Sequence, residues 1–536
     1  MSTQKTSTCV AIYSNSYAWQ ELIVPPLQHI VGVAPEKDIL DLFALARKVG
    51  TVTLADNPAD QTSTISWGSY IRLAQLQTPG TPFFPSLNRL RIDHAGGSLD
   101  ELNLLVTNSL RVLEVVNIDD SQYPAFIVFL CSLAGECPRL RSITLSSRPI
   151  DWLEACLEFS HLRELKLDGI LHELDLDMLV AIGKGFPELE TFILNAEYDS
   201  CISTPQLNTD EACEVSGVPV PLGSQDEIQE PSASTTNVPP ETASPSDDRA
   251  PQDGAKSPPA SPVKKTPEPT FRQLKKLHIV GCLQLIQDVL SLCSGLEDVS
   301  LTLVRLGEST DSEIARTEIF ASIIERIFDW NKCLARMFIG QNWQIEVPEL
   351  GPAILPSRAV QKLFLHSTLQ HLEIANWALD AFATYLSCLA PRPPFHFNSM
   401  LTTLHLPVGS ISPGISLSDL RHLAISCPHL SSLRSTILLD LNNLPEYKIG
   451  RAADVALHHK LETLSVGSAN GPAWNWMQYC TAARHLFALF PAVKIQPQMG
   501  PGRNPVRWMT IRDTLQMYQT VSLDNKARRR AYGLDL

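Results

Sequence analysis

The segment HLRELKLDGI, residues 161–170, contains one copy of a pattern that recurs along the chain. Its apolar residues Leu162, Leu165 and Leu167 occupy the frame L-x-x-L-x-L, and charged residues fill most of the positions between them. The last two leucines are two residues apart, so both point to the same face of a short strand. The stretch therefore predicts a strand whose leucines belong to a core and whose charged residues face away from it.

The same frame, with any apolar residue allowed at each L, returns along most of the chain. Copies occur at 86–92, 109–115, 139–145, 161–167, 188–194, 273–279, 295–301, 333–339, 368–374, 400–406 and 460–466, with a degenerate copy at 429–435. Segments with apolar residues three and four apart separate the copies, which is typical of helices. Stacked strand–turn–helix units bury one continuous core. The sequence predicts an α/β fold, an irregular leucine-rich-repeat solenoid (a horseshoe) over 81–201 and 270–500.

A doubly wound α/β domain is the alternative fold, because it also alternates strands and helices. Its central strands are buried on both faces and would be continuous β-branched runs. The copies in this chain are short, Leu-based and constant in frame, which favours the solenoid.

Composition narrows the class of protein. The chain has 536 residues, of which 44% are hydrophobic, and a net charge of −14, so it lacks the basic field of a nucleic-acid binder. No apolar run of roughly 18 residues predicts a membrane span, and the first residues do not resemble a signal peptide. The 12 cysteines include no C-x-x-C pair, which is typical of reduced thiols. We expect a cytoplasmic or nuclear protein with neither nucleic acid nor membrane as a partner.

Residues 202–269 interrupt the repeats with a segment rich in Pro, Ser, Thr and acidic residues. Such a composition cannot bury enough apolar surface to offset its chain entropy, so we predict a disordered acidic insertion. Four of the hydroxyl residues that precede a proline are candidate phosphorylation sites: Ser244, Ser257, Ser261 and Thr266. The alternative is a solvated insertion in which these pairs occur by chance.

A second pattern, at 19–27, is built on Trp19, Leu22, Pro25, Pro26 and Leu27. It resembles the tail of an F-box and its junction in fungal, basidiomycete-type F-box proteins with leucine-rich repeats. Similar features follow in the order of that family: a tryptophan segment at 67–76, a Phe-Pro-x-Leu at 84–87 and a closing region at 483–521. We expect a disordered N-terminus at 1–18, a helical F-box remnant at 19–80, and a C-terminal helix with a basic tail at 501–536.

The resemblance implies a subunit of a cullin-type ubiquitin ligase, in which the F-box binds the Skp adaptor and the repeats bind the substrate. This chain departs from the family at one point, because the polar residues before Trp19 contain no Leu-Pro-x-Glu helix. Two hypotheses therefore stand: a substrate-recognition subunit, and a scaffold or adaptor without ligase association. The basic cluster Lys526 with Arg528 to Arg530 is either a solvated tail or a nuclear import signal.

Catalytic chemistry has little support in the sequence. It contains no H-E-x-x-H, G-x-S-x-G, P-loop or G-x-G-x-x-G motif. His172, Glu173, Asp175 and Asp177 lie close together, but they alternate with leucines as on a solvated face. We therefore assign no catalytic, cofactor or metal residues, and keep an enzyme of unknown class only as a remote alternative.

Function is expected on the concave side of the solenoid, which the strands line. The candidate contacts to a protein partner are the residues that alternate with the core positions or follow a strand: Arg91, Glu114, Glu164, Lys166, Asp168, His278, Arg336, Phe338, Glu373, Trp377 and His405. Exposed aromatic residues are the strongest anchors at protein interfaces. Phe338 is the preferred anchor and Trp377 the second, and the alternative for Phe338 is packing under a neighbouring loop.

Overall fold

The computed structural model describes most of the repeats. It covers residues 9–13 (backbone), 44, 46–55, 82–93, 102, 105–116, 118, 123–146, 151–170, 174–196, 269–305, 310–343, 352–380, 400–407, 411–412, 414–441, 444, 457, 459–467, 474–498 and 505–532. The chain divides into two units, Met1–Ser200 with Pro267–Leu536, and Cys201–Thr266. Residues 202–268 of the predicted insertion lie outside the described residues, together with Ser244, Ser257, Ser261 and Thr266.

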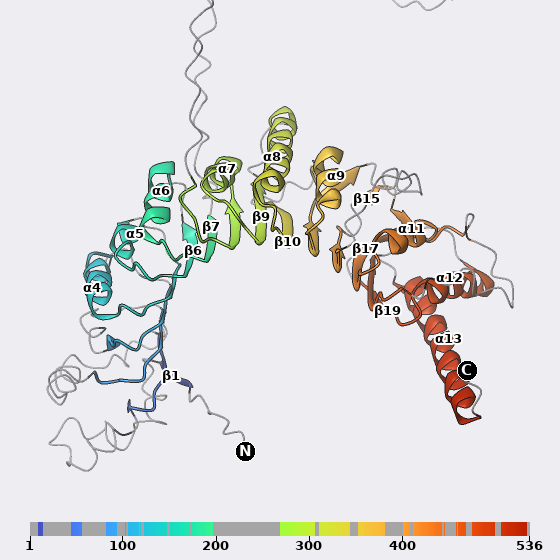
Figure 1. Ribbon diagram of the computed structural model, residues 1–536, viewed down its shortest axis with the longest axis horizontal. Helices are drawn as coiled ribbons and strands as arrows, with labels where there is room; N and C mark the ends of the chain where they lie inside the picture. Colours follow the sequence, from blue (N-terminus) through green and yellow to red (C-terminus); the bar gives the residue numbers. More distant parts are fainter. Residues whose placement is uncertain are drawn as a thin grey trace, which may run out of the picture. The chain divides into compact units, whose positions relative to one another are not determined.

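A 16-stranded sheet runs through the first unit, and all of its neighbouring strands are parallel (Figure 1). In order these strands are β1 (Cys9–Tyr13), β2 (Thr51–Ala55), β3 (Arg89–Asp93), β4 (Val112–Val116), β5 (Ser142–Ser146), β6 (Glu164–Ile170), β7 (Thr191–Ala196), β8 (Lys276–Gly281), β9 (Asp298–Arg305), β10 (Arg336–Trp343), β12 (His371–Ala375), β14 (Thr403–His405), β17 (Ser432–Leu438), β18 (Thr463–Gly467) and β19 (Lys494–Pro497). The strand β16 (Ile415–Ser416) pairs with the far end of β17. A small second sheet joins β11 (Ile354–Leu355), β13 (Ala378–Asp380) and β15 (Ile411–Ser412).

The strand order never reverses, which distinguishes this sheet from a doubly wound domain. In a doubly wound sheet the order reverses at a switch point, whereas here each strand of the main path pairs with the strand of the next repeat. The twelve predicted copies of the frame all form strands of this path. The architecture is therefore a parallel α/β sheet of stacked strand–helix repeats, consistent with the predicted leucine-rich-repeat solenoid.

The repeats on the two sides of the insertion are direct neighbours. Strand β7 pairs with β8 in an unbroken register from Thr191↔Lys276 to Asn195↔Val280. The sheet is therefore continuous, although a long segment of the chain separates these two strands in the sequence.

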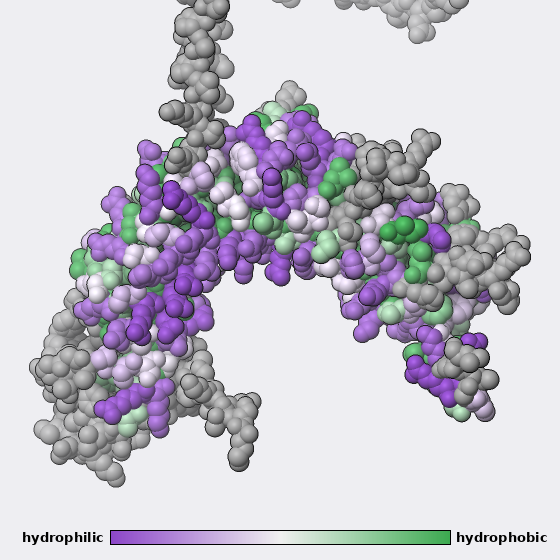
Figure 2. Space-filling model, viewed as in Figure 1, coloured by the Kyte–Doolittle hydropathy of each residue, from purple (hydrophilic) through white to green (hydrophobic). Residues whose placement is uncertain are grey.

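The apolar frame positions form the core. In the copy at 161–167, Leu162, Leu165 and Leu167 are fully buried, and the equivalent residues of the other copies are likewise buried. The degenerate copy places a hydroxyl there instead, because Ser435 is fully buried and its Oγ has only a 3.5 Å contact with the carbonyl of Thr436. Most of the residues between the core positions are polar, and Figure 2 shows hydrophilic side chains along the strand side from β6 to β10.

Backbone hydrogen bonds hold the start of each strand against the previous repeat. The carbonyl of Arg141, which precedes β5, accepts the N–H groups of Arg163 and Glu164 at 2.8 and 2.9 Å. The same pair of hydrogen bonds recurs in successive repeats, for example from the N–H groups of Lys275 and Lys276 to the carbonyl of Glu190. This ladder holds the residues before the strands in line as well as the strands themselves.

The helices cover one side of the main sheet (Figure 1). They are α4 (Tyr123–Glu136), α5 (Asp151–Cys156), α6 (Leu176–Gly185), α7 (Leu283–Ser291), α8 (Thr310–Trp330), α9 (Ser357–Leu365), α11 (Asp419–Ser426), α12 (Trp476–Leu489) and α13 (Val506–Ala531). Asp175 is the N-cap of α6, and its Oδ1 accepts the N–H of Met178 at 2.8 Å. Two of the clustered acidic residues thus serve the helix start, since Asp177 lies in its first turn.

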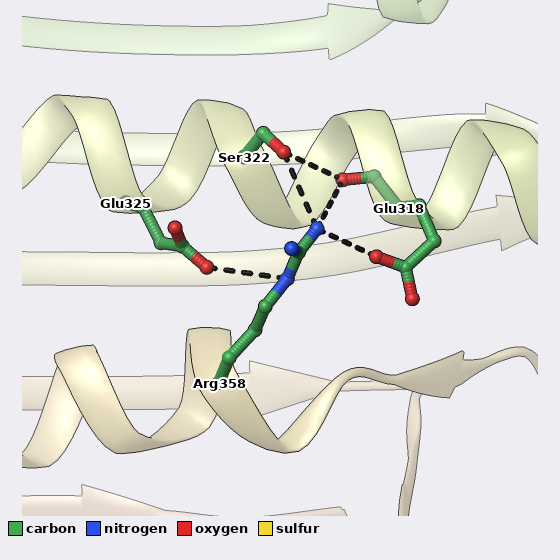
Figure 3. A network of polar contacts seen from close by, with 4 residues as sticks. All are labelled: Glu318, Ser322, Glu325 and Arg358. Carbon is green, nitrogen blue, oxygen red and sulfur yellow. Dashed lines mark hydrogen bonds and ion pairs between the residues drawn. The ribbon is translucent and has the colours of Figure 1, made fainter. Parts of the chain in front are cut away.

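An arginine joins α8 to α9 on the helix side (Figure 3). The Nη2 of Arg358 donates to Glu318 Oε2 at 2.6 Å and to the Glu318 carbonyl at 3.2 Å, while Ser322 Oγ lies 3.3 Å away. Its Nε lies 3.3 Å from Glu325 Oε1, an ion pair without hydrogen-bond alignment. All three partners lie on one face of α8, so a single side chain holds the two helices together.

The N-terminal region of the chain differs from the sequence-based expectations. Residues 1–18 were expected to be disordered and 19–80 helical, but β1 and β2 are strands that pair in register, Val10 with Val52. Val49 and Val52 occupy frame positions, so the repeats begin earlier than predicted. At the other end, the helix α13 lies within the expected C-terminal helical region, and Arg528 to Arg530 form its exposed last turn. None of the helices among the described residues is both long and apolar enough to span a membrane.

Candidate functional site: the strand face

The parallel registers line up the outward residues of the strands in three rows, which we call the first, middle and third rows of the strand face. The middle row consists of Arg91, Glu114, Thr144, Lys166, Ile193, His278, Ser300, Phe338, Glu373, His405, Arg434, Ser465 and Gln496. Seven of the eleven predicted contacts are in this row. Glu164 and Arg336 belong to the first row and Asp168 to the third.

Charged residues of the strand face pair with one another. Glu114 forms ion pairs with Arg89 and with Arg91, the latter at 3.6 Å. Lys166 Nζ lies 3.5 Å from Asp168, and Arg336 lies 3.7 Å from Asp298 of the neighbouring strand. These ion pairs are partly exposed and individually weak. A charged group of a binding partner can therefore replace one member of a pair at little cost in free energy.

His278 lies in the middle row between Ile193 and Ser300. Burial lowers the pKa of its imidazole, and the positive charge of Lys166 lowers it further. The side chain is therefore neutral near pH 7 and presents one donor and one acceptor to a partner.

Phe338 is half-buried in the middle row, flanked in register by Ser300 and Glu373. Its ring lies over Gly340 of the same strand: a Cβ added at Gly340 would be 2.8 Å from Phe338 Cε1 and 3.1 Å from Thr302 Oγ1. The glycine therefore gives the ring room to lie along the strand.

Trp377 is not a surface residue, which corrects the prediction. Its side chain is fully buried and stacks on Phe320 of α8, with ring centroids 5.4 Å apart and planes at 6°. The cause is Asn376, whose φ of 61° turns the chain just after β12. This turn is held by Asn376 Nδ2 donating to the Gln341 carbonyl at 3.1 Å. Trp377 consequently points into the core, a reversal that no strand periodicity reveals.

A polar cluster spans β12, β14 and β17. Nδ1 of His405 lies 3.7 Å from Glu373 Oε2 and its Nε2 lies 3.1 Å from Ser432 Oγ. Arg434 follows His405 in the middle row, and its Nε is buried without a hydrogen-bond partner among the described atoms. The neighbouring His405 imidazole, and next the Arg434 guanidinium, lower the pKa of Glu373. Arg434 was not among the predicted contacts. Its position between the frame positions Leu433 and Ser435 of the degenerate copy nevertheless indicates that it belongs to the strand face.

The order Ser432–His405–Glu373 has the connectivity of a nucleophilic triad, but its geometry does not support catalysis. The His405–Glu373 distance of 3.7 Å is too long for an orienting hydrogen bond. The N–H of Ser432 donates to the Thr402 carbonyl at 3.1 Å, so it is not free to bind an oxyanion. The cluster suits recognition of a polar partner better than acyl transfer.

Metal binding also lacks a site in the part of the chain that the structure describes. No group of three His, Cys, Asp or Glu side chains there is arranged to hold an ion. His172 and Glu173 of the clustered polar residues lie outside the described residues.

Comparisons with known proteins add little to this picture. No protein-family model and no curated protein sequence matches the chain. Among solved structures, it is similar to the crystal structure of an internalin from Listeria monocytogenes, with 11% sequence identity and a TM-score of 0.34, over 92% of this chain and 91% of that one. A likeness this weak carries no argument about function, and the repeat architecture rests on the strands and registers of the chain itself.

Proposed function

We propose that the strand face binds another protein, with Phe338 as the central anchor. The observation that carries this proposal is a half-buried aromatic ring in a row of polar residues, with Glu373 in register beside it. Aromatic residues surrounded by polar groups that exchange partners easily are typical of interface centres.

The test compares two variants of the full chain as bait. Phe338→Ala combined with Glu373→Ala removes the anchor and its neighbour, whereas Ile319→Ala removes an exposed apolar residue of α8. We expect the double variant to lose a defined set of co-purified proteins that wild type and Ile319→Ala both retain, with thermal unfolding unchanged. Recovery of the same proteins by the double variant would contradict the proposal. So would a loss of co-purified proteins that is explained by unfolding of the variant.

We further propose that the bound protein is the substrate of a cullin-type ubiquitin ligase. Only the resemblance to F-box proteins at 19–27, 67–76, 84–87 and 483–521 supports this finer assignment, and residues 19–27 and 67–76 lie outside the described residues. A pull-down of the full chain with the Skp adaptor tests it, since an F-box subunit retains the adaptor. Failure to retain the adaptor would favour the alternative, a repeat scaffold or adaptor without ligase association.

A further inference from the structure

A pocket of about 570 Å³ lies at the edge of the sheet where β4, β5 and β6 begin. Its charged lining consists of Arg111, Arg139, Arg141, His161, Arg163 and Glu188. Four guanidinium groups and an imidazole thus surround one carboxylate, in a chain whose overall net charge is −14. These residues precede the strands and do not belong to the strand face.

The backbone ladder aligns three of these arginines. Arg111, Arg141 and Arg163 each immediately precede a strand of three successive repeats. The Arg141 N–H donates to the Arg111 carbonyl and the Arg163 N–H to the Arg141 carbonyl, both at 2.8 Å. Neighbouring strands lie about 4.8 Å apart, so three exposed guanidinium groups start from equivalent points along one edge. This spacing allows two or three of them to reach the same small anion.

The charges of the arginines are only partly compensated. Glu188 Oε1 lies 3.0 Å from His161 Nδ1, and Arg163 forms ion pairs with Glu188 Oε2 at 3.7 Å and with Glu190 Oε1 at 3.4 Å. His161, and then Arg163 and Arg141, lower the pKa of Glu188, as expected for a carboxylate among cations. No carboxylate of the described residues lies within ion-pair distance of Arg111, Arg139 or Arg141. Like charges on adjacent strands repel each other, so a bound anion would relieve a repulsion built into the fold.

The ligand that best fits this lining is a phosphate monoester. The planar guanidinium fork pairs with two oxygens of a phosphate, and several forks around one pocket suit a dianion. An extended polyanion fits less well because the basic edge is short. The residues before the next strands are Glu190, Lys275 and Glu297, so the sign of the charge changes beyond β6.

We infer that this arginine pocket binds the phosphate of a phosphoserine or phosphothreonine in a protein partner. The pocket adjoins the strand face, since Ser142 and Glu164 directly follow Arg141 and Arg163 and open β5 and β6. A phosphorylated segment seated at this edge continues onto the surface proposed for partner binding. The inference goes beyond the proposed function, because it concerns other residues and another chemical group, and phosphate recognition can be measured without Phe338.

The test measures fluorescence anisotropy of the full chain with a fluorescein-labelled degenerate peptide library that has a fixed central phosphothreonine. The same library with threonine is the matched probe. We expect binding of the phosphorylated library only, and at least a tenfold loss for the double variant Arg111→Gln, Arg141→Gln. Arg139→Gln should lose severalfold, whereas Arg326→Gln, an exposed arginine of α8, should bind as wild type does. Phe338→Ala should also retain phosphate-dependent binding, which separates this site from the strand face.

Several results would overturn the inference. Equal binding of the two libraries would show that phosphate is not recognised, and an equal loss in Arg326→Gln would show only non-specific charge attraction. Competition by inorganic phosphate as strongly as by the phosphorylated library would show an anion site without peptide recognition. Stronger competition by a single-stranded oligonucleotide than by the phosphorylated library would assign the edge to nucleic acid.

Discussion

Replacing the segment between β7 and β8 offers a direct test of the continuous sheet. In the variant, a six-residue Gly-Ser linker replaces Cys201–Thr266, which shortens the loop between these strands from roughly 79 to roughly 19 residues, still able to span about 60 Å. Strand β7 already pairs with β8 along five residues, so no strand pairing is removed. Loop closure costs (3/2)RT ln n, and the shorter loop should stabilise the protein by about 1.3 kcal/mol.

The assay is urea unfolding monitored by far-UV circular dichroism, with both proteins at equal concentration. A matched control keeps the segment and changes Leu277→Ala, a buried frame residue of β8 whose loss should cost about 2–5 kcal/mol. We expect a midpoint at or above that of wild type for the linker variant and a clear decrease for the control. A decrease of more than about 1 kcal/mol, or a transition that splits in two, would refute the inference that β7 and β8 form a continuous sheet without help from the segment.

Three further predictions follow from burial. Leu165→Ala should destabilise the protein by about 3 kcal/mol in thermal or urea unfolding, while Lys166→Ala next to it should change stability by less than about 0.5 kcal/mol; equal effects would contradict the division into core and face. Buried His459 accepts the Leu461 N–H at Nδ1, which leaves its Nε2 to donate to the Cys427 carbonyl at 2.8 Å, and burial lowers its pKa below 6.5. The unfolded protein binds a proton at this histidine more readily than the folded protein does, so the stabilising contribution should be complete above pH 6.5 and decrease as the pH falls below it. His459→Gln should therefore reduce the change in the urea midpoint between pH 7.5 and pH 5. An unchanged dependence of the midpoint on pH would disprove this role. Exposed Cys333 should react with a thiol reagent within minutes in the native state, whereas burial raises the pKa of Cys156 to about 12 and should protect it until unfolding, as peptide mass mapping can show.

The part of the fold that follows from short-range pattern was predictable. A residue two places from another on a strand shares its face whatever the rest of the chain does, so Leu165 and Leu167 identify a core from the sequence alone. The same rule placed Lys166 and Glu373 on the outside. It missed β1 and β2, because their frame positions are mostly Val and Ile rather than Leu and because that region was interpreted through the F-box resemblance.

Other features depend on which repeats become neighbours and on single backbone turns. Trp377 could not be placed by periodicity, because one positive φ at Asn376 reverses its direction. The contact of His405 with Glu373 and Ser432 joins residues of three different strands. Such contacts are set by register, which a residue's immediate sequence neighbours do not contain.

A repeated strand, a shared leucine core and rows of mostly polar outward residues all follow from the sequence, because burial of apolar surface follows a local period. The pairing of β7 with β8 across the long segment, and the alignment of Arg111, Arg141 and Arg163 along one edge, depend instead on how the repeats stack. These arginines are some 20 to 30 residues apart in the sequence. They meet because parallel stacking brings equivalent positions of successive repeats to about 4.8 Å from each other.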